Sequence, residues 1–116
     1  ELKEVYEKIG GDYDDVVRRL MGEKLVRKFL LKFLDDKSYA DLERTLSEGD
    51  YKEAFRAAHT LKGVCLNLGF TELYKVSAEL TEVLRGRETA GSDELYAQVK
   101  EQYTTLTDAI RELAGN

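Results

Sequence analysis

The sequence contains no proline and no tryptophan, and it has one cysteine among its 116 residues. Because proline interrupts helices, its absence favours long continuous helices. A single cysteine cannot form an internal disulfide bond, which is typical of proteins from a reducing compartment. No apolar run approaches the roughly 18 residues of a membrane span. We therefore expect a cytoplasmic protein with no membrane partner.

Basic residues are fewer than acidic residues, 18 against 23, which gives a formal net charge of -5. Binding to nucleic acid depends on neutralising phosphates, so this acidic balance argues against a nucleic-acid partner. The sequence is 42% hydrophobic and 35% charged. This composition and length are typical of one globular domain with one core, and we expect a single domain over residues 1–116.

Apolar residues recur at intervals of three and four along the chain, as in amphipathic helices. No stretch alternates as a strand would, and short turns with glycine separate the helical segments. These patterns predict an all-α fold, an up-down four-helix bundle with additional short N-terminal helices. The third predicted helix has a wide apolar face made by Leu25, Val26, Phe29, Leu30 and Phe33.

Several residues mark the expected helix ends. Ser38, Asp50 and Thr71 are predicted N-caps, and Glu53 lies where a capping-box partner of Asp50 would lie. Gly69 is predicted to end the helix that Asp50 begins, because glycine is the usual residue just past a helix end. The sequence thus predicts a long central helix at about residues 50–68.

This central helix carries His59, the only histidine of the chain. At about 100° per residue, His59 falls roughly opposite the apolar stripe and therefore on the face that meets solvent. The stripe predicted to face the core consists of Ala54, Ala58, Leu61, Cys65 and Leu68, with Ala57 and Val64 at its edge.

The charged neighbours of His59 on this face are basic, namely Lys52, Arg56 and Lys62. Histidine titrates near neutral pH, so a neutral, nucleophilic imidazole is available there. Lys62 could hold an anion beside the ring. Gly63 costs about 1 kcal/mol relative to alanine inside a helix, and it would leave room for another molecule. Nucleophile, cation and clearance together indicate a phosphoryl acceptor.

Two apolar residues, Phe55 and Leu66, lie within about 40° of His59 on the helical wheel. They could form a docking patch with Lys52, Arg56 and Asn67, or they could be covered by neighbouring segments. Lys52 and Arg56 could equally be ordinary solvated charges, and Asn67 could serve only to end the helix.

Other roles of His59 are a surface histidine without function and a metal ligand. A metal site would need further histidine or cysteine ligands. The sequence offers only Cys65, which lies on the core stripe. We therefore expect no metal site, and Cys65 is expected to be a buried apolar residue.

The stretch AHTLKGVCLNLGF resembles the acceptor helix of histidine-containing phosphotransfer (HPt) domains. The family pattern is His, any residue, Leu, Lys, Gly, followed downstream by Leu-Gly. The matching positions here are His59, Leu61, Lys62, Gly63, Leu68 and Gly69.

This resemblance implies that His59 accepts a phosphoryl group from the phospho-aspartate of a response-regulator receiver domain and passes it to another receiver. It implies a monomeric carrier without an ATP site or a cofactor of its own, since Mg²⁺ belongs to the partner receiver. Family members often place Gln or Glu on the following helix to orient the imidazole. The matching position is Thr81, whose shorter side chain puts that contact in doubt.

Two competing functions are an enzyme of the sensor histidine kinase type and a helical adaptor that binds a receiver or kinase without phosphotransfer. A kinase would need a nucleotide-binding region with Asn- and Gly-rich motifs, which the chain lacks. An adaptor would keep its function after His59→Gln. The sequence does not distinguish a free-standing protein from one module of a hybrid histidine kinase.

Overall fold

The computed structural model describes residues 1–86 and 91–115, and these residues form helices joined by short turns. No strand occurs in these two ranges. The predicted all-α class is therefore confirmed. The helices are α1 (Leu2–Lys8), α2 (Tyr13–Arg19), α3 (Glu23–Phe33), α4 (Ser38–Ser47), α5 (Tyr51–Leu68), α6 (Thr71–Arg85) and α7 (Ser92–Gly115).

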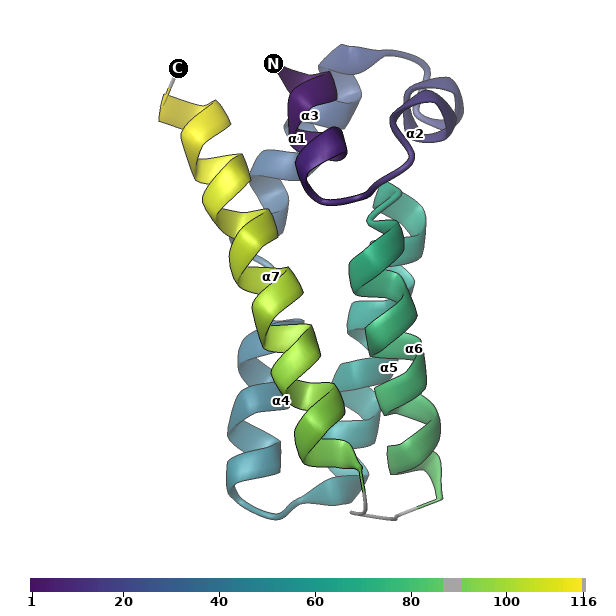
Figure 1. The fold of residues 1–116 in the computed structure, drawn as a ribbon, viewed down its shortest axis with the longest axis vertical. Coiled ribbons are helices and arrows are strands. Elements are labelled where there is room, and N and C mark those ends of the chain that lie inside the picture. Colours follow the sequence, from purple (N-terminus) through teal and green to yellow (C-terminus); the bar gives the residue numbers. More distant parts are fainter. Residues whose placement is uncertain (87–90, 116) are drawn as a thin grey trace.

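Helices α4, α5, α6 and α7 lie side by side along the long axis of the molecule (Figure 1). Each runs opposite to the one before it, so α5 and α6 form a helical hairpin. Helices α1, α2 and α3 gather at the end where α5 passes into α6. The middle of α5, where His59 lies, is thus left uncovered by the short N-terminal helices.

The apolar stripe of α5 faces the core as predicted. Each of its five residues and the edge residue Ala57 is buried, while Val64 is partly buried. On the far side of the core, the ring of Tyr39 in α4 stacks on that of Tyr103 in α7, with centroids 4.0 Å apart. Aromatic packing therefore joins α4 to α7.

Both predicted ends of α5 are confirmed. The Asp50 carboxylate accepts a hydrogen bond from the Glu53 backbone N–H at 3.3 Å. Gly69 follows the helix with φ +71°, a left-handed conformation that glycine adopts without steric cost. The Glu53 side chain, however, forms an ion pair with Arg56 at 2.9 Å and does not return to Asp50. Asp50 therefore caps the helix, but the second hydrogen bond of a capping box, from the Asp50 backbone N–H to the Glu53 side chain, is not formed.

Two other local predictions, both of N-caps, are wrong. Ser38 and Thr71 are the first residues of α4 and α6 rather than N-caps, and Lys37 and Phe70 occupy the cap positions without a side-chain cap bond. At α4 the carboxylate of Asp36 accepts the Ser38 backbone N–H at 3.0 Å, so one of the N–H groups that lack a partner within the helix is satisfied from outside it. Leu25 is 41% exposed, because on the helical wheel it lies at the edge of the apolar face, whose buried centre is Val26, Leu30 and Phe33.

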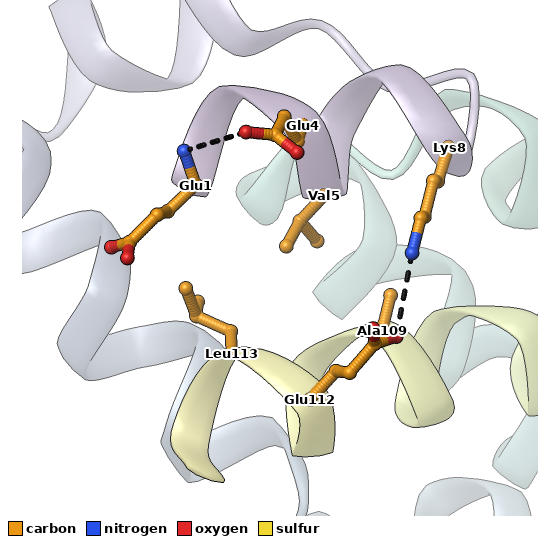
Figure 2. A pocket seen from close by; sticks show the side chains of 7 residues that line it. All are labelled: Glu1, Glu4, Val5, Lys8, Ala109, Glu112 and Leu113. Carbon is orange, nitrogen blue, oxygen red and sulfur yellow. Dashed lines mark hydrogen bonds and ion pairs between the residues drawn. The ribbon is translucent and has the colours of Figure 1, made fainter. Parts of the chain in front are cut away.

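Helix α1 is anchored on both α5 and α7. The Tyr6 hydroxyl donates a buried hydrogen bond of 2.6 Å to the backbone carbonyl of Leu68, at the end of α5. Helix α1 also lies along α7, where Lys8 and Glu112 form an ion pair at 3.3 Å beside a small hollow (Figure 2). The hollow is lined by α1, α7 and Glu1, and no residue of α5 reaches it. It therefore lies apart from the helix that carries His59.

Candidate functional site

His59 lies near the middle of α5, and its imidazole is exposed. Its ring packs on Phe55, one turn earlier, with centroids 6.1 Å apart and an angle of 21° between the planes. Within the described chain the imidazole makes no hydrogen bond or ion pair. A nucleophilic nitrogen is thus left open to solvent on a rigid, well-packed helix.

The cations around His59 differ in their partners. Arg56 is neutralised by Glu53 at 2.9 Å. Lys62 and Lys52 form no ion pair with any acidic side chain in residues 1–86 and 91–115. Lys62 is three residues after His59 and therefore on the same helical face. The free positive charge beside the imidazole is that of Lys62, as the sequence suggested.

Gly63 lies one turn after His59, and the space beside it is open. A Cβ atom built on Gly63 would meet no atom within 4 Å outside its own helix backbone. Gly63 is in regular α-helix, so neither backbone conformation nor packing requires a glycine there. The intramolecular structure gives no reason for the missing side chain, which is consistent with clearance for another molecule.

The remaining residues predicted on this face are also accessible. Leu66 is 58% exposed, Asn67 is exposed, and Phe55 is half-buried. Leu66 lies two turns after His59, about 10 Å along the axis. The predicted face therefore continues as an apolar surface toward the end of α5.

A shallow groove borders this end of α5, and sequence reasoning did not find it. It is lined by Arg19, Leu20, Phe29, Val64, Asn67 and Leu68, which come from α2, α3 and α5. Phe29 was assigned to the apolar face of α3, and it does pack there while one side remains open. Only the docking of α2 and α3 against α5 brings these residues together.

Arg19 fixes that arrangement. Its guanidinium donates to the Asp15 carboxylate at 2.7 Å and to the backbone carbonyl of Leu66 at 3.2 Å. The hydrogen bond from Arg19 lowers the pKa of Asp15 below its ordinary value, and nearby arginine charge acts in the same direction. The Leu66 carbonyl, which also accepts the Gly69 backbone N–H at 3.4 Å, is thereby tied to α2.

Thr81 is fully buried on α6, and its hydroxyl donates to the Ser77 carbonyl at 2.7 Å. Its hydrogen-bonding capacity is thus used within its own helix, and it makes no hydrogen bond to the imidazole. Glu82 is exposed and bonds Arg85 at 3.1 Å. No carboxylate or amide of the described chain orients the ring of His59.

Cys65 is free and buried, and burial is the main cause that raises the pKa of its thiol, with the charge of Asp36 adding to it. A thiol held protonated in this way is a poor ligand and a poor nucleophile. Among the described residues, no group of three or more His, Cys, Asp or Glu side chains is arranged to hold a metal ion.

Comparison with known proteins agrees with this geometry. The family model of the Hpt domain matches residues 28–113, which include the whole of α4, α5 and α6 and most of α3 and α7. This chain belongs to the Hpt domain family. Hpt domains are phosphocarrier modules of two-component signalling, and the general role of the chain is histidine phosphotransfer in a phosphorelay.

Curated relatives point the same way. The chain is 30% identical over 104 residues to the sensory/regulatory protein RpfC from two strains of Xanthomonas campestris pv. campestris. The match covers 75% of this chain and 14% of each relative's length, so the chain spans a small part of those proteins. No solved structure gives a significant match. In the described part of the Hpt domain, no helix combines the length and apolarity needed to cross a membrane.

Proposed function

We propose that His59 accepts a phosphoryl group from the phospho-aspartate of a response-regulator receiver domain and passes it to the aspartate of another receiver. The observation that carries this proposal is the exposed imidazole on α5, with the unpaired Lys62 and the open space at Gly63 on the same face. Membership of the Hpt family and similarity to a sensory/regulatory protein support it.

In the proposed reaction, Nε2 of neutral His59 attacks the phosphorus of the acyl phosphate in line with the bond that breaks. A P–N bond forms, the P–O bond breaks, and the aspartate carboxylate leaves with the electron pair. The product is a phosphoramidate, which remains a reactive phosphoryl donor. The same step can therefore run in reverse toward a second receiver.

Phosphoryl transfer depends mainly on positioning and on compensation of charge at the transferred group. We assign that compensation within this chain to the Lys62 ammonium, which has no competing acidic partner among the described residues. Gly63 supplies clearance, because a longer side chain there would occupy the space in which the receiver's aspartate must approach.

The partner's docking surface is proposed to comprise Lys52, Phe55, Arg56, Leu66 and Asn67. The groove beside Leu20 and Phe29 continues this surface onto the N-terminal helices. Apolar anchors surrounded by polar and charged groups are the usual composition of such interfaces. Lysine charge at the rim would steer an acidic receiver surface toward His59.

The proposed carrier acts as a monomeric cytoplasmic domain over residues 1–116, built as an up-down four-helix bundle. It has no ATP site and no metal of its own, and the Mg²⁺ that holds the leaving aspartate belongs to the receiver. Receiver domains, free or within a hybrid histidine kinase, are the proposed partners.

The decisive experiment is transfer from a radiolabelled receiver phospho-aspartate to the wild type and to His59→Gln. We expect an acid-labile, base-stable label on the wild type and none on the variant, and no label on either protein from ATP alone. Equal labelling of the variant would exclude His59 as acceptor. A wild type that binds receivers without taking label would support the adaptor alternative.

A further inference from the structure

The imidazole of His59 has no hydrogen-bonding partner in the described chain, yet its ring is packed. It lies on the ring of Phe55 at 6.1 Å with the planes 21° apart. This spacing and angle fall in the range of offset-stacked aromatic pairs. Residues four apart on a helix lie one above the other, so the backbone of α5 itself presents Phe55 to the histidine.

Phe55 is in turn held from the neighbouring helix. The guanidinium of Arg85 on α6 lies over the Phe55 ring, 5.0 Å from its centroid, which is a cation–π geometry. The guanidinium donates three hydrogen bonds to Glu82, from Nε to Oε1 at 3.1 Å, from Nε to Oε2 at 3.4 Å and from a terminal nitrogen to Oε2 at 3.3 Å. Glu82, Arg85 and Phe55 thus form a continuous series of contacts that ends at His59.

These contacts are the restraint on the imidazole in a chain whose described residues offer it no hydrogen bond. The Thr81 hydroxyl donates its hydrogen bond to the Ser77 carbonyl, and no side chain of the described residues hydrogen-bonds the imidazole. An exposed histidine without restraint samples several rotamers. In-line attack requires the ring nitrogen to point at the phosphorus, so a restraint on the ring plane increases the reactive fraction.

We propose that Phe55, held by Arg85, is a positioning residue that fixes the plane of the His59 imidazole for phosphoryl transfer. This inference rests on the proposed function, because it concerns the geometry of the same acceptor. Phe55 does not touch the reacting atoms in this role. It acts by limiting rotation of the ring that does.

The expected size of the effect follows from the strength of aromatic pairs. Loss of such a pair corresponds to a roughly 2- to 12-fold slower transfer step. If Phe55 served only to dock the receiver, its loss would raise the half-saturating receiver concentration instead. The maximal rate and the half-saturating concentration therefore separate the two roles.

The experiment compares the wild type with Phe55→Leu, Phe55→Tyr, Arg85→Gln and the control Lys75→Gln. Leucine keeps an apolar side chain without a ring, and tyrosine keeps the ring. Lys75 forms an i,i+3 pair with Glu72 on the same helix, at 3.2 Å, and touches no aromatic ring. Each variant is checked by circular dichroism and urea unfolding.

The first readout is the proton NMR signal of the imidazole in the free protein, which is unambiguous because the chain has one histidine. Stacking on Phe55 shifts the ring protons of His59 through the ring current. We expect Phe55→Leu to remove that shift, Arg85→Gln to reduce it, and Phe55→Tyr and Lys75→Gln to preserve it.

The second readout is the single-turnover transfer rate at saturating phosphorylated receiver. Phe55→Leu is expected to lower this rate roughly 2- to 12-fold, with Phe55→Tyr restoring it. Unchanged imidazole signals, or a loss confined to half-saturation, would overturn the positioning role. If the wild type accepts no phosphoryl group, the proposed function fails and the positioning role with it. The NMR comparison identifies this outcome, because the ring-current shift of His59 would then be present although the wild type takes no phosphoryl group.

Discussion

At the scale of single residues, Lys62 is the cation that lies on the same helical face as His59 and forms no ion pair in the described chain. It lies three residues after His59 and has no acidic partner in the described chain. We expect Lys62→Ala to slow transfer from a phosphorylated receiver by roughly 10-fold, because one stabilising charge is lost at the transferred group. The free energy of unfolding should change by less than about 0.5 kcal/mol, since the side chain makes no ion pair or hydrogen bond with the described residues.

The check is a transfer time course with urea unfolding, and Lys75→Ala is the control. Lys75 has the same charge and is exposed on α6, where it pairs with Glu72. A Lys62→Ala protein that transfers at the wild-type rate would show that the lysine is an ordinary surface charge.

Gly63 is the second residue at which structure and function make opposite demands. Gly63→Gln should stabilise the fold by about 0.5 kcal/mol through helix propensity, because open space surrounds the position. The same variant should slow transfer, since the longer side chain fills the approach to His59. Urea unfolding and transfer rates measure the two effects.

The variant Gly63→Ala separates the effect of helix propensity from the effect of side-chain size. It should give at least as large a gain in stability with a smaller loss of rate, because alanine has the better propensity and adds one carbon. Equal transfer rates for glycine, alanine and glutamine would remove the clearance argument.

At the scale of the element, α5 is held in register by its ends. Asp50→Ala removes the carboxylate that accepts the Glu53 N–H, so it should cost about 1 kcal/mol in the free energy of unfolding. Transfer by the folded protein should be unaffected, because the cap lies more than two turns from His59. The measurement is urea unfolding, with Glu48→Gln as a charge control outside the helix.

If fully folded Asp50→Ala protein transferred phosphoryl groups more slowly than the wild type, the cap would not act on stability alone. That result would mean that the start of α5 contributes to receiver binding, since nearby Lys52 belongs to the proposed docking surface. The half-saturating receiver concentration would then rise while the maximal rate stayed constant.

At the scale of the whole molecule, one buried hydrogen bond joins the N-terminal helices to the acceptor helix. The Tyr6 hydroxyl donates to the Leu68 carbonyl at 2.6 Å. Tyr6→Phe leaves that carbonyl without its partner, and should cost about 1–2 kcal/mol in the free energy of unfolding. Tyr51→Phe is the control, because that half-buried hydroxyl has no hydrogen-bond partner in the described chain. Equal stability of the two variants would contradict the expectation.

The same tyrosine makes stability depend on alkaline pH. Burial raises the pKa of Tyr6 above its ordinary value of 10.0, and the opposing charge of Arg19 is the smaller effect. The folded state therefore holds the proton more tightly than the unfolded state. Stability from this group is complete below pH 10 and is lost as pH rises from there toward the folded pKa.

Unfolding curves between pH 7 and 11 test this, and Tyr6→Phe should make the decline above pH 10 less steep. Cys65 adds an earlier decline from about pH 9, because burial raises the pKa of its thiol in the same direction. A slope unaffected by Tyr6→Phe would show that another group controls the alkaline limit.

The helices were predictable because their signals are local. Periodicity placed the core stripe of α5 correctly, and Asp50 and Gly69 marked its ends. Ser38 failed as a cap because Asp36 supplies the carboxylate that bonds the first turn of α4. Leu25 lies on the predicted apolar face of α3, but periodicity does not show how much of the width of that face meets the core.

The sequence by itself determined the exposed face of α5, on which His59, Lys62 and Gly63 share one side. That arrangement follows from helical geometry over a few residues and needs no neighbour. The tertiary structure decided what surrounds the face. The groove beside Phe29 and the contact of Arg85 with Phe55 join residues far apart in the chain. Such contacts depend on how helices pack against one another, and a local sequence pattern does not predict that packing.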